Sequence, residues 1–218
     1  YAFDNGQSDE GRAYGYHGSA GGLSTTPDWI AESNQASALF GNTVATAGDV
    51  NGDGYDDVIV GSLNYDNGET DEGRAFVYHG SAAGLSSTAS WTFESDQSLA
   101  YLQIGASAGD VNGDGFGDVV VASTDYDNGE TDEGVAWVFL GSAGGLAASG
   151  TLLEANQGSA SFGTRAASAG DVDGDGYDDV IVGAPQFDNG QTDEGQVRLF
   201  RGSGSGISSA VAFSFDPD

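Results

Sequence analysis

Residues 49–57 read Asp-Val-Asn-Gly-Asp-Gly-Tyr-Asp-Asp, and two further copies of this acidic loop follow at residues 110–118 and 171–179. The copies are evenly spaced, because 110 − 49 and 171 − 110 both equal 61. A fixed period of this length is typical of repeat proteins in which each repeat is one supersecondary unit. The loop therefore marks one point of a repeating unit, and the remainder of the unit can be read outward from it.

Oxygen atoms recur at alternate positions of each loop. Ca²⁺ takes about six to eight oxygen ligands from carboxylates, amides and backbone carbonyls, so side chains at positions 1, 3, 5 and 9 and the carbonyl at position 7 can enclose one ion. These positions keep an oxygen donor in every copy, whereas position 8 changes from Asp56 to Gly117 to Asp178. We predict three Ca²⁺ sites with the following ligands: Asp49, Asn51, Asp53, the Tyr55 carbonyl and Asp57; Asp110, Asn112, Asp114, the Phe116 carbonyl and Asp118; Asp171, Asp173, Asp175, the Tyr177 carbonyl and Asp179.

The loop is not an EF-hand, because position 12 is Val60, Val121 or Val182 in place of a bidentate Glu. Each loop runs directly into β-branched residues, which are typical of a strand. The simpler alternative is an Asp- and Gly-rich turn without an ion. Three or four converging carboxylates would repel one another in such a turn, so the loop is expected to hold a cation.

The rest of each period consists of short strands and turns. After the strand comes an acidic turn, then an alternating segment ending in Gly-Ser, a small-residue turn and a last apolar segment; the acidic turns begin at Asp4, Asp66, Asp127 and Asp188. Four short strands on a long period predict an all-β fold made of four-stranded β-propeller blades. The acidic turn leaves two alternatives open, a plain tight turn or a second cation site formed by Glu69, Asp71 and Glu72.

The third copy carries the fullest family signature. Phe162-Gly163, Ala169-Gly170 with the loop that follows, and Gly183-Ala184-Pro185 resemble the FG-GAP repeat, the blade unit of the integrin α-subunit head and of many secreted bacterial proteins. The resemblance implies an integrin-α-like propeller, commonly with about seven blades in that family, that holds Ca²⁺ between the first two strands of a blade. It is looser elsewhere, since Phe-Gly becomes Tyr101-Leu102 in the second copy.

The strand count predicts one propeller domain of three and a half blades. A half blade with the last two strands covers residues 1–36, and full blades cover residues 37–98, 99–158 and 159–218. Such a chain is expected to form part of a larger ring or of an assembly. Since it begins with Tyr1 and contains no Met, we expect a trimmed piece of a longer polypeptide. Unpaired strand edges promote association, so other protein subunits, joined as a homo-oligomer or polymer through an open blade edge, are the expected partners.

Composition favours a secreted or cell-surface location. The formal charge is −29, and three bound Ca²⁺ would leave −23, which disfavours nucleic acids and anionic membranes as partners. No apolar stretch is long enough for direct membrane insertion. The chain has no Cys, and this fits an extracellular fold held together by calcium rather than by disulfides.

No enzymatic activity is expected. Acidic residues mostly follow the repeat, whereas a single active site would break it, and His17 and His79 have no third His or Cys to complete a zinc site. The predicted function is an extracellular, calcium-stabilised adhesion or structural assembly module that acts through protein–protein contacts and self-assembles into a surface or filamentous polymer. The alternative is a carbohydrate-binding or accessory propeller of a larger secreted enzyme, with aromatic residues such as Tyr14 and Tyr16 stacking on a glycan.

Overall fold

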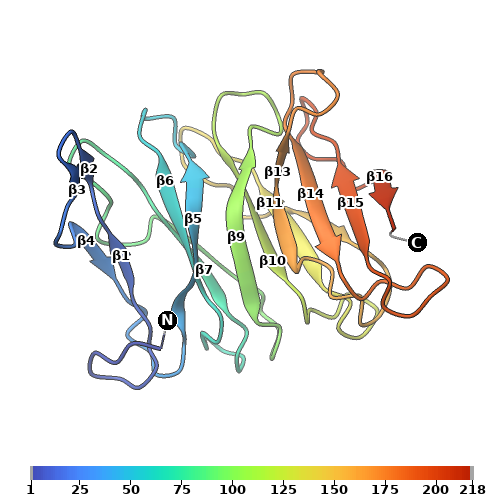
Figure 1. The fold of residues 1–218 in the computed structure, drawn as a ribbon, viewed down its shortest axis with the longest axis horizontal. Helices are drawn as coiled ribbons and strands as arrows, with labels where there is room; N and C mark the ends of the chain where they lie inside the picture. Colours follow the sequence, from blue (N-terminus) through green and yellow to red (C-terminus); the bar gives the residue numbers. More distant parts are fainter. Residues whose placement is uncertain (1, 217–218) are drawn as a thin grey trace.

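Three four-stranded antiparallel sheets follow one another along the chain, each with its strands in sequence order. The structure is a computed structural model that describes residues 2–216, apart from the side chains of residues 103 and 104. Within this range the regular elements are all β-strands. Figure 1 shows the sheets side by side from the N-terminal to the C-terminal end of the chain, as in consecutive propeller blades. The predicted all-β propeller fold is therefore confirmed.

The bounds of the blades follow the repeat. Blade 1 consists of β5 (Phe40–Gly48), β6 (Asp57–Ser62), β7 (Arg74–Tyr78) and β8 (Trp91–Glu94). Blade 2 consists of β9 (Leu102–Gly109), β10 (Asp118–Ser123), β11 (Val135–Phe139) and β12 (Thr151–Glu154). Blade 3 consists of β13 (Arg165–Gly170), β14 (Asp179–Ala184), β15 (Gln196–Phe200) and β16 (Val211–Phe215). These strands lie within the predicted units 37–98, 99–158 and 159–218, whose boundaries stay predictions; the extreme residues 1, 217 and 218 lie outside the described range.

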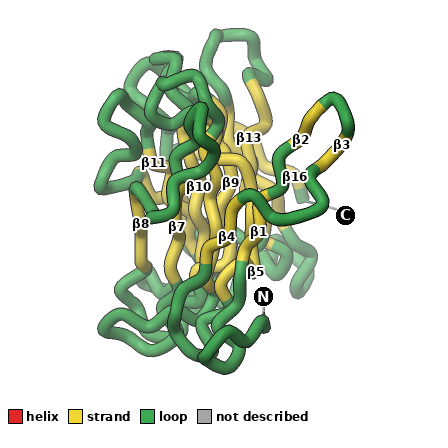
Figure 2. The backbone as a smooth tube through the Cα atoms, turned by 90° about the vertical axis from the view of Figure 1, so that its left-hand side faces the viewer, coloured by secondary structure: helices red, strands yellow, loops and turns green. Residues whose placement is uncertain are grey.

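The N-terminal region forms half a blade. Strand β1 (Ala13–Gly15) pairs with β4 (Trp29–Ala31) in a two-stranded antiparallel sheet. The small-residue turn between them was predicted only as a turn, but it contains the two-residue strands β2 (Gly18–Ser19) and β3 (Gly22–Leu23). This short hairpin projects from the half blade in Figure 2.

Continuous apolar runs form the second strand of each blade, and in blade 2 both faces of this strand are covered by neighbouring blades. In β10, Val119 and Val121 pack with residues of blade 1, whereas Val120 and Ala122 pack with residues of blade 3. Side chains alternate between the two faces of a strand, so a strand that lies between two neighbouring sheets has no polar side. This explains why all six residues of β10 are buried.

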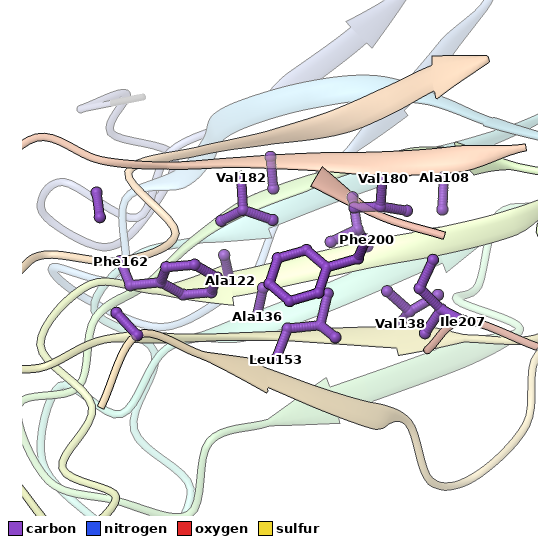
Figure 3. Close-up of a cluster of buried hydrophobic side chains, with 14 of the residues drawn as sticks. Ala108, Ala122, Ala136, Val138, Leu153, Phe162, Val180, Val182, Phe200 and Ile207 are labelled. Carbon is purple, nitrogen blue, oxygen red and sulfur yellow. The ribbon is translucent and has the colours of Figure 1, made fainter. Parts of the chain in front are cut away.

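The core lies between the blades rather than within them. Three clusters of buried side chains fill the spaces between the half blade and blade 1, between blades 1 and 2, and between blades 2 and 3. Figure 3 shows the last of these clusters, where Phe200 of blade 3 lies beside Ala136 and Leu153 of blade 2, and Phe162 lies beside Ala122. Each blade therefore depends on its neighbours for the burial of its apolar side chains.

The hairpin connections lie at two opposite ends of the sheets. The loops at residues 49–57, 110–118 and 171–179 join the first and second strands, and we call their end the loop rim (upper end in Figure 1). The acidic turns join the second and third strands at the other end, which we call the turn rim. The connections from one blade to the next also run along the turn rim. Acidic residues are thus present at both rims, in the loops at one and in the acidic turns at the other.

Candidate metal centre

The first Asp of each loop organises the backbone around it. In the first loop the carboxylate of Asp49 accepts hydrogen bonds from the N–H groups of Gly52 (2.7 Å), Asp53 (3.1 Å) and Gly54 (2.7 Å). Asp171 does the same in the third loop, where the N–H of Gly176 is the main cause of a pKa below the ordinary carboxyl value. These bonds bend the chain so that the following side chains point back toward position 1.

Glycine at position 6 is required by this bend. Gly54, Gly115 and Gly176 have φ values of +90°, +89° and +94°. A residue with a Cβ rarely adopts this left-handed conformation. Beside this turn, the N–H of position 5 donates to the carboxylate of position 1 in every loop.

Positions 1, 3 and 5 come together in the structure. In the third loop, carboxylate oxygens of Asp171, Asp173 and Asp175 lie within 4.8 Å of one another. In the first loop, the Asn51 side chain accepts the N–H of Asp53 at 3.0 Å. In the second loop, the Asp114 N–H donates to the side chains of Asp110 and Asn112, and the Asp114 carboxylate accepts the Phe116 N–H. Carboxylate and amide oxygens of this kind suit a hard divalent cation, while the carbonyl ligands at position 7 stay a prediction.

Position 9 lies in a different environment, because its carboxylate is buried beneath the loop. Asp118 accepts the N–H of Val111 and that of Gly141, both at 2.8 Å. It therefore ties the loop to the turn between the third and fourth strands, and the same pair of bonds recurs for Asp57 and Asp179. Burial raises the pKa of Asp118 to about 6, against the contribution of these hydrogen bonds. Its role as a metal ligand stays a prediction.

Position 8 was not predicted to be a ligand, and in the structure it lies between neighbouring loops. The Asp178 carboxylate accepts the N–H of Asp110 at 2.9 Å, and the Asp178 N–H donates to the Asp110 carbonyl at 3.0 Å. Gly117 donates in the same way to the carbonyl of Asp49 at 2.8 Å. Each loop is therefore linked to the loop of the next blade. A contact between residues 68 positions apart has no local sequence signal.

A positive charge adjoins only one of the three ligand sets within residues 2–216. Arg201 forms an ion pair with Asp173, with 3.0 Å between Nη1 and Oδ2. The equivalent positions in the half blade and the first two blades are His17, His79 and Leu140. Thus the third loop, which has the additional carboxylate of Asp173, also has the additional positive charge of Arg201 beside it.

Fold and loops together define a propeller segment whose blades carry an acidic loop between their first two strands. The chain belongs to the FG-GAP repeat family, because the family profile matches residues 40–78, 104–139 and 162–200. Each matched range contains one acidic loop and lies within the first three strands of a blade.

Several integrin alpha chains are similar to this one. Integrin alpha-PS2 of Drosophila melanogaster is 35% identical over 172 residues, which cover 71% of this chain and 12% of the relative. Integrin alpha-5 of Xenopus laevis is 30% identical over 184 residues, covering 78% and 17%. Integrin alpha-V of Gallus gallus is 35% identical over 164 residues, covering 69% and 15%. The chain thus spans less than a fifth of the length of these relatives. Among residues 2–216 there is no helix of the length and apolarity needed to cross a membrane.

Proposed function

We propose that this chain is an extracellular, calcium-stabilised propeller segment that acts without catalysis as an adhesion or structural assembly module. The observation that carries the proposal is an exposed apolar face on blade 3. Residues that are buried between blades elsewhere in the chain lie open to solvent there. A face of this kind is built to receive another blade.

The repeat provides an internal comparison for this face. Ile59 and Val120 are fully buried, but Ile181, at the same repeat position in blade 3, is 38% exposed. Phe215 pairs with Val197 as Leu153 pairs with Ala136. Leu153 is nevertheless fully buried, whereas Phe215 is 58% exposed. The side chains keep their apolar character although no blade of the described chain covers them.

The face also contains a groove. A cavity of about 440 Å³ is lined by Pro185, Gln196, Val197, Phe215 and neighbouring residues. Exposed apolar patches of this kind mark sites of protein–protein interaction. The occupant we propose is a further FG-GAP blade carried by another subunit, since its apolar face would match the one that blades 1 and 2 already bury. Because the two ends of the chain are different surfaces, repeated contacts of this type form a ring or a filament.

The acidic loops support both the proposed calcium binding and the proposed extracellular location. The donor sets at residues 49–57, 110–118 and 171–179 contain only oxygen atoms, as Ca²⁺ prefers. Extracellular calcium modules bind with dissociation constants of about 10⁻⁴–10⁻³ M, so the loops would be filled outside the cell. We therefore propose three Ca²⁺ sites and a secreted or cell-surface location.

Sedimentation velocity over a concentration series, in the presence of Ca²⁺, tests the assembly function. The wild-type chain is expected to self-associate, and Phe215→Ser to weaken the association at least tenfold. Val44→Ser provides the control, because Val44 is an exposed apolar residue on the inner strand β5 of blade 1. A wild-type chain that stays monomeric in every sample would contradict the proposal.

Glycan binding is the second candidate function. Tyr14 and Tyr16 are exposed aromatic side chains in the half blade, where they could stack on a sugar ring. A glycan array distinguishes the two functions: binding that is lost in Tyr14→Ala, with an unchanged oligomeric state, would favour the carbohydrate-binding alternative.

A further inference from the structure

A glutamate with a buried carboxylate oxygen recurs in every acidic turn of the turn rim. Glu10, Glu72 and Glu133 are fully buried, and Glu194 occupies the fourth equivalent position. Each has at least one carboxylate oxygen that is buried and accepts no hydrogen bond from the described residues. A buried carboxylate without a partner is costly. A cation bound beside such a carboxylate would remove this cost.

In blade 1 the buried glutamate meets two other carboxylates. Glu72 lies in the turn between β6 and β7, Glu94 ends β8, and Asp96 follows in the connection to β9. Carboxylate oxygens of the three residues lie within 4.8 Å of one another. Two oxygens that each lie about 2.5 Å from one Ca²⁺ can be up to about 5 Å apart. The spacing is therefore that of ligands around a single ion.

We propose that Glu72, Glu94 and Asp96 bind a divalent cation of the calcium class at the turn rim, separate from the acidic loops. Three carboxylates are the ligands of a hard cation. The sequence had suggested Glu69 and Asp71 as partners of Glu72, but the structure brings Glu94 and Asp96 to it instead. Those two residues are more than twenty positions away in the sequence, so no local pattern connects them with Glu72.

The contacts of these residues leave room for an ion. Glu72 accepts the Asn67 N–H at 2.6 Å through Oε1, and its buried Oε2 has no partner among the described residues. Glu94 accepts the Asn67 side-chain amide at 2.7 Å and pairs with Arg74 at 3.0 Å. Three carboxylates and one guanidinium leave two negative charges, which one divalent cation neutralises.

Blade 2 provides a comparison within the same chain. There, Glu133 and Glu154 are retained, but the position of Asp96 is taken by Asn156 and that of Arg74 by Val135. One negative and one positive charge are lost together, so the balance of charge in this group of positions is unchanged. The αL conformation at Asp96 and Asn156 (φ +54° and +56°) explains the choice of Asp or Asn, but it does not explain the buried glutamate.

The proposed ion would add a contact beyond the end of the β7–β8 backbone ladder, where Arg74 pairs with Glu94. It would hold the β6–β7 turn, the end of β8 and the start of the segment that leads into blade 2. That segment already contacts the next acidic turn, because Gln97 accepts the Asp127 N–H at 2.7 Å and donates to the Asp127 carbonyl at 3.1 Å. Binding at the turn rim would therefore stabilise the junction between blades 1 and 2.

Calcium titration of the chelated and desalted wild-type chain at pH 7, followed by native mass spectrometry and calorimetry, tests the proposal. Glu72→Gln is expected to bind one Ca²⁺ fewer than the wild type. Glu69→Gln is the matched control, because Glu69 is an exposed acidic residue of the same turn, and it is expected to bind the same number as the wild type.

Asp96→Asn keeps the test decisive if Glu72→Gln fails to fold, since Asn occupies this position in the half blade and in blade 2. It is expected to weaken one Ca²⁺ site about tenfold. Unchanged calcium stoichiometry and affinity in Glu72→Gln, or in Asp96→Asn if the former does not fold, would overturn the proposal and assign Glu72 as a buried neutral acid. Loss of an ion in Asp53→Ala reports on the loop rim alone, so failure of either type of site can be recognised separately.

Discussion

The third loop differs from the other two at one side-chain ligand position, where Asp173 replaces Asn51 and Asn112. An additional carboxylate would strengthen cation binding, but Arg201 lies 3.0 Å from it. The two charges therefore offset each other at the same site. Such pairs are detected only when the side chains are placed in space, because Asp173 and Arg201 belong to different hairpins.

Removing the positive charge is expected to strengthen calcium binding by the third loop. Arg201→Leu, which copies Leu140 of blade 2, should raise the affinity by a few-fold, about the effect of an exposed ion pair of up to 1 kcal/mol. Calcium titration at low and high salt measures the change, with Arg165→Leu as the control. An affinity that does not rise at low salt would show that Arg201 does not act on the ion.

Calcium binding by the second loop is expected to depend on pH. Burial raises the pKa of Asp118 from 3.8 to about 6, and Ca²⁺ binds the carboxylate form, so binding releases a proton. The apparent affinity should fall as the pH falls through 6, by about tenfold per pH unit below it. Calorimetric titration at pH 5 and pH 7, in two buffers of different ionisation enthalpy, measures both affinity and proton release. Equal affinity at both values would contradict the prediction.

In the metal-free chain, the stability of the fold changes with pH in the opposite direction to the calcium affinity. Between about pH 4 and pH 6 the folded state keeps a proton on Asp118 that the unfolded state has lost. This carboxyl therefore makes the metal-free fold less stable as the pH rises through that window, and bound Ca²⁺ removes the penalty. We propose that a bound ion makes the buried Asp118 carboxylate compatible with the fold at neutral pH.

At the scale of elements, the outer strands β4 and β8 are joined to the next blade by tryptophan. The indole N–H of Trp29 donates to the Ser86 carbonyl at 2.8 Å, and that of Trp91 donates to the Ala147 carbonyl at 3.0 Å. Both bonds connect the fourth strand of one blade to the turn before the fourth strand of the next. They add a directional contact to the apolar packing between blades.

Trp91→Phe should destabilise the fold by about 1–2 kcal/mol, because it removes this hydrogen bond and leaves the Ala147 carbonyl without it. Thermal and urea unfolding in saturating Ca²⁺ measure the change. Tyr55→Phe is a suitable control, since Tyr55 is an exposed aromatic residue and keeps its ring and backbone carbonyl. If the midpoint of urea unfolding were the same for Trp91→Phe and the wild type, the assigned role would be contradicted.

At the scale of the whole molecule, stability is distributed over junctions between blades. Each blade shares its core with its neighbours, and the acidic loops are linked from blade to blade through contacts such as that of Asp178 with Asp110. We propose that ions bound by the loops support several of these junctions together. Calcium is therefore expected to control the stability of the entire segment and not of single loops.

Chelation is expected to lower the melting temperature by about 10 °C. A ligand at tenfold excess over its dissociation constant stabilises by about 1.4 kcal/mol per site, so three loop sites contribute about 4 kcal/mol against a typical net stability of about 5–15 kcal/mol. Calorimetry with Ca²⁺ and with chelator measures the shift. The single-loop variants Asp53→Ala, Asp114→Ala and Asp175→Ala should each lose part of it, whereas equal melting with and without chelator would exclude a structural role for the ions.

Local features of the fold could be predicted from the sequence. The position of each acidic loop, the strand that follows it and the convergence of positions 1, 3 and 5 in the third loop depend on residues within about ten positions of one another. Turn geometry and strand alternation act over this range, so a repeated pattern was sufficient. The Gly at position 6 illustrates this, since its left-handed φ is required by the loop itself.

The tertiary structure alone decided which residues from distant parts of the chain meet. It placed Asp178 against Asp110, Arg201 against Asp173, and Glu94 and Asp96 beside the buried Glu72. It also determined that Ile181 and Phe215 are exposed although their equivalents in earlier blades are buried. These outcomes depend on the packing of one blade against the next, and identical repeat positions differ according to whether a neighbouring blade covers them.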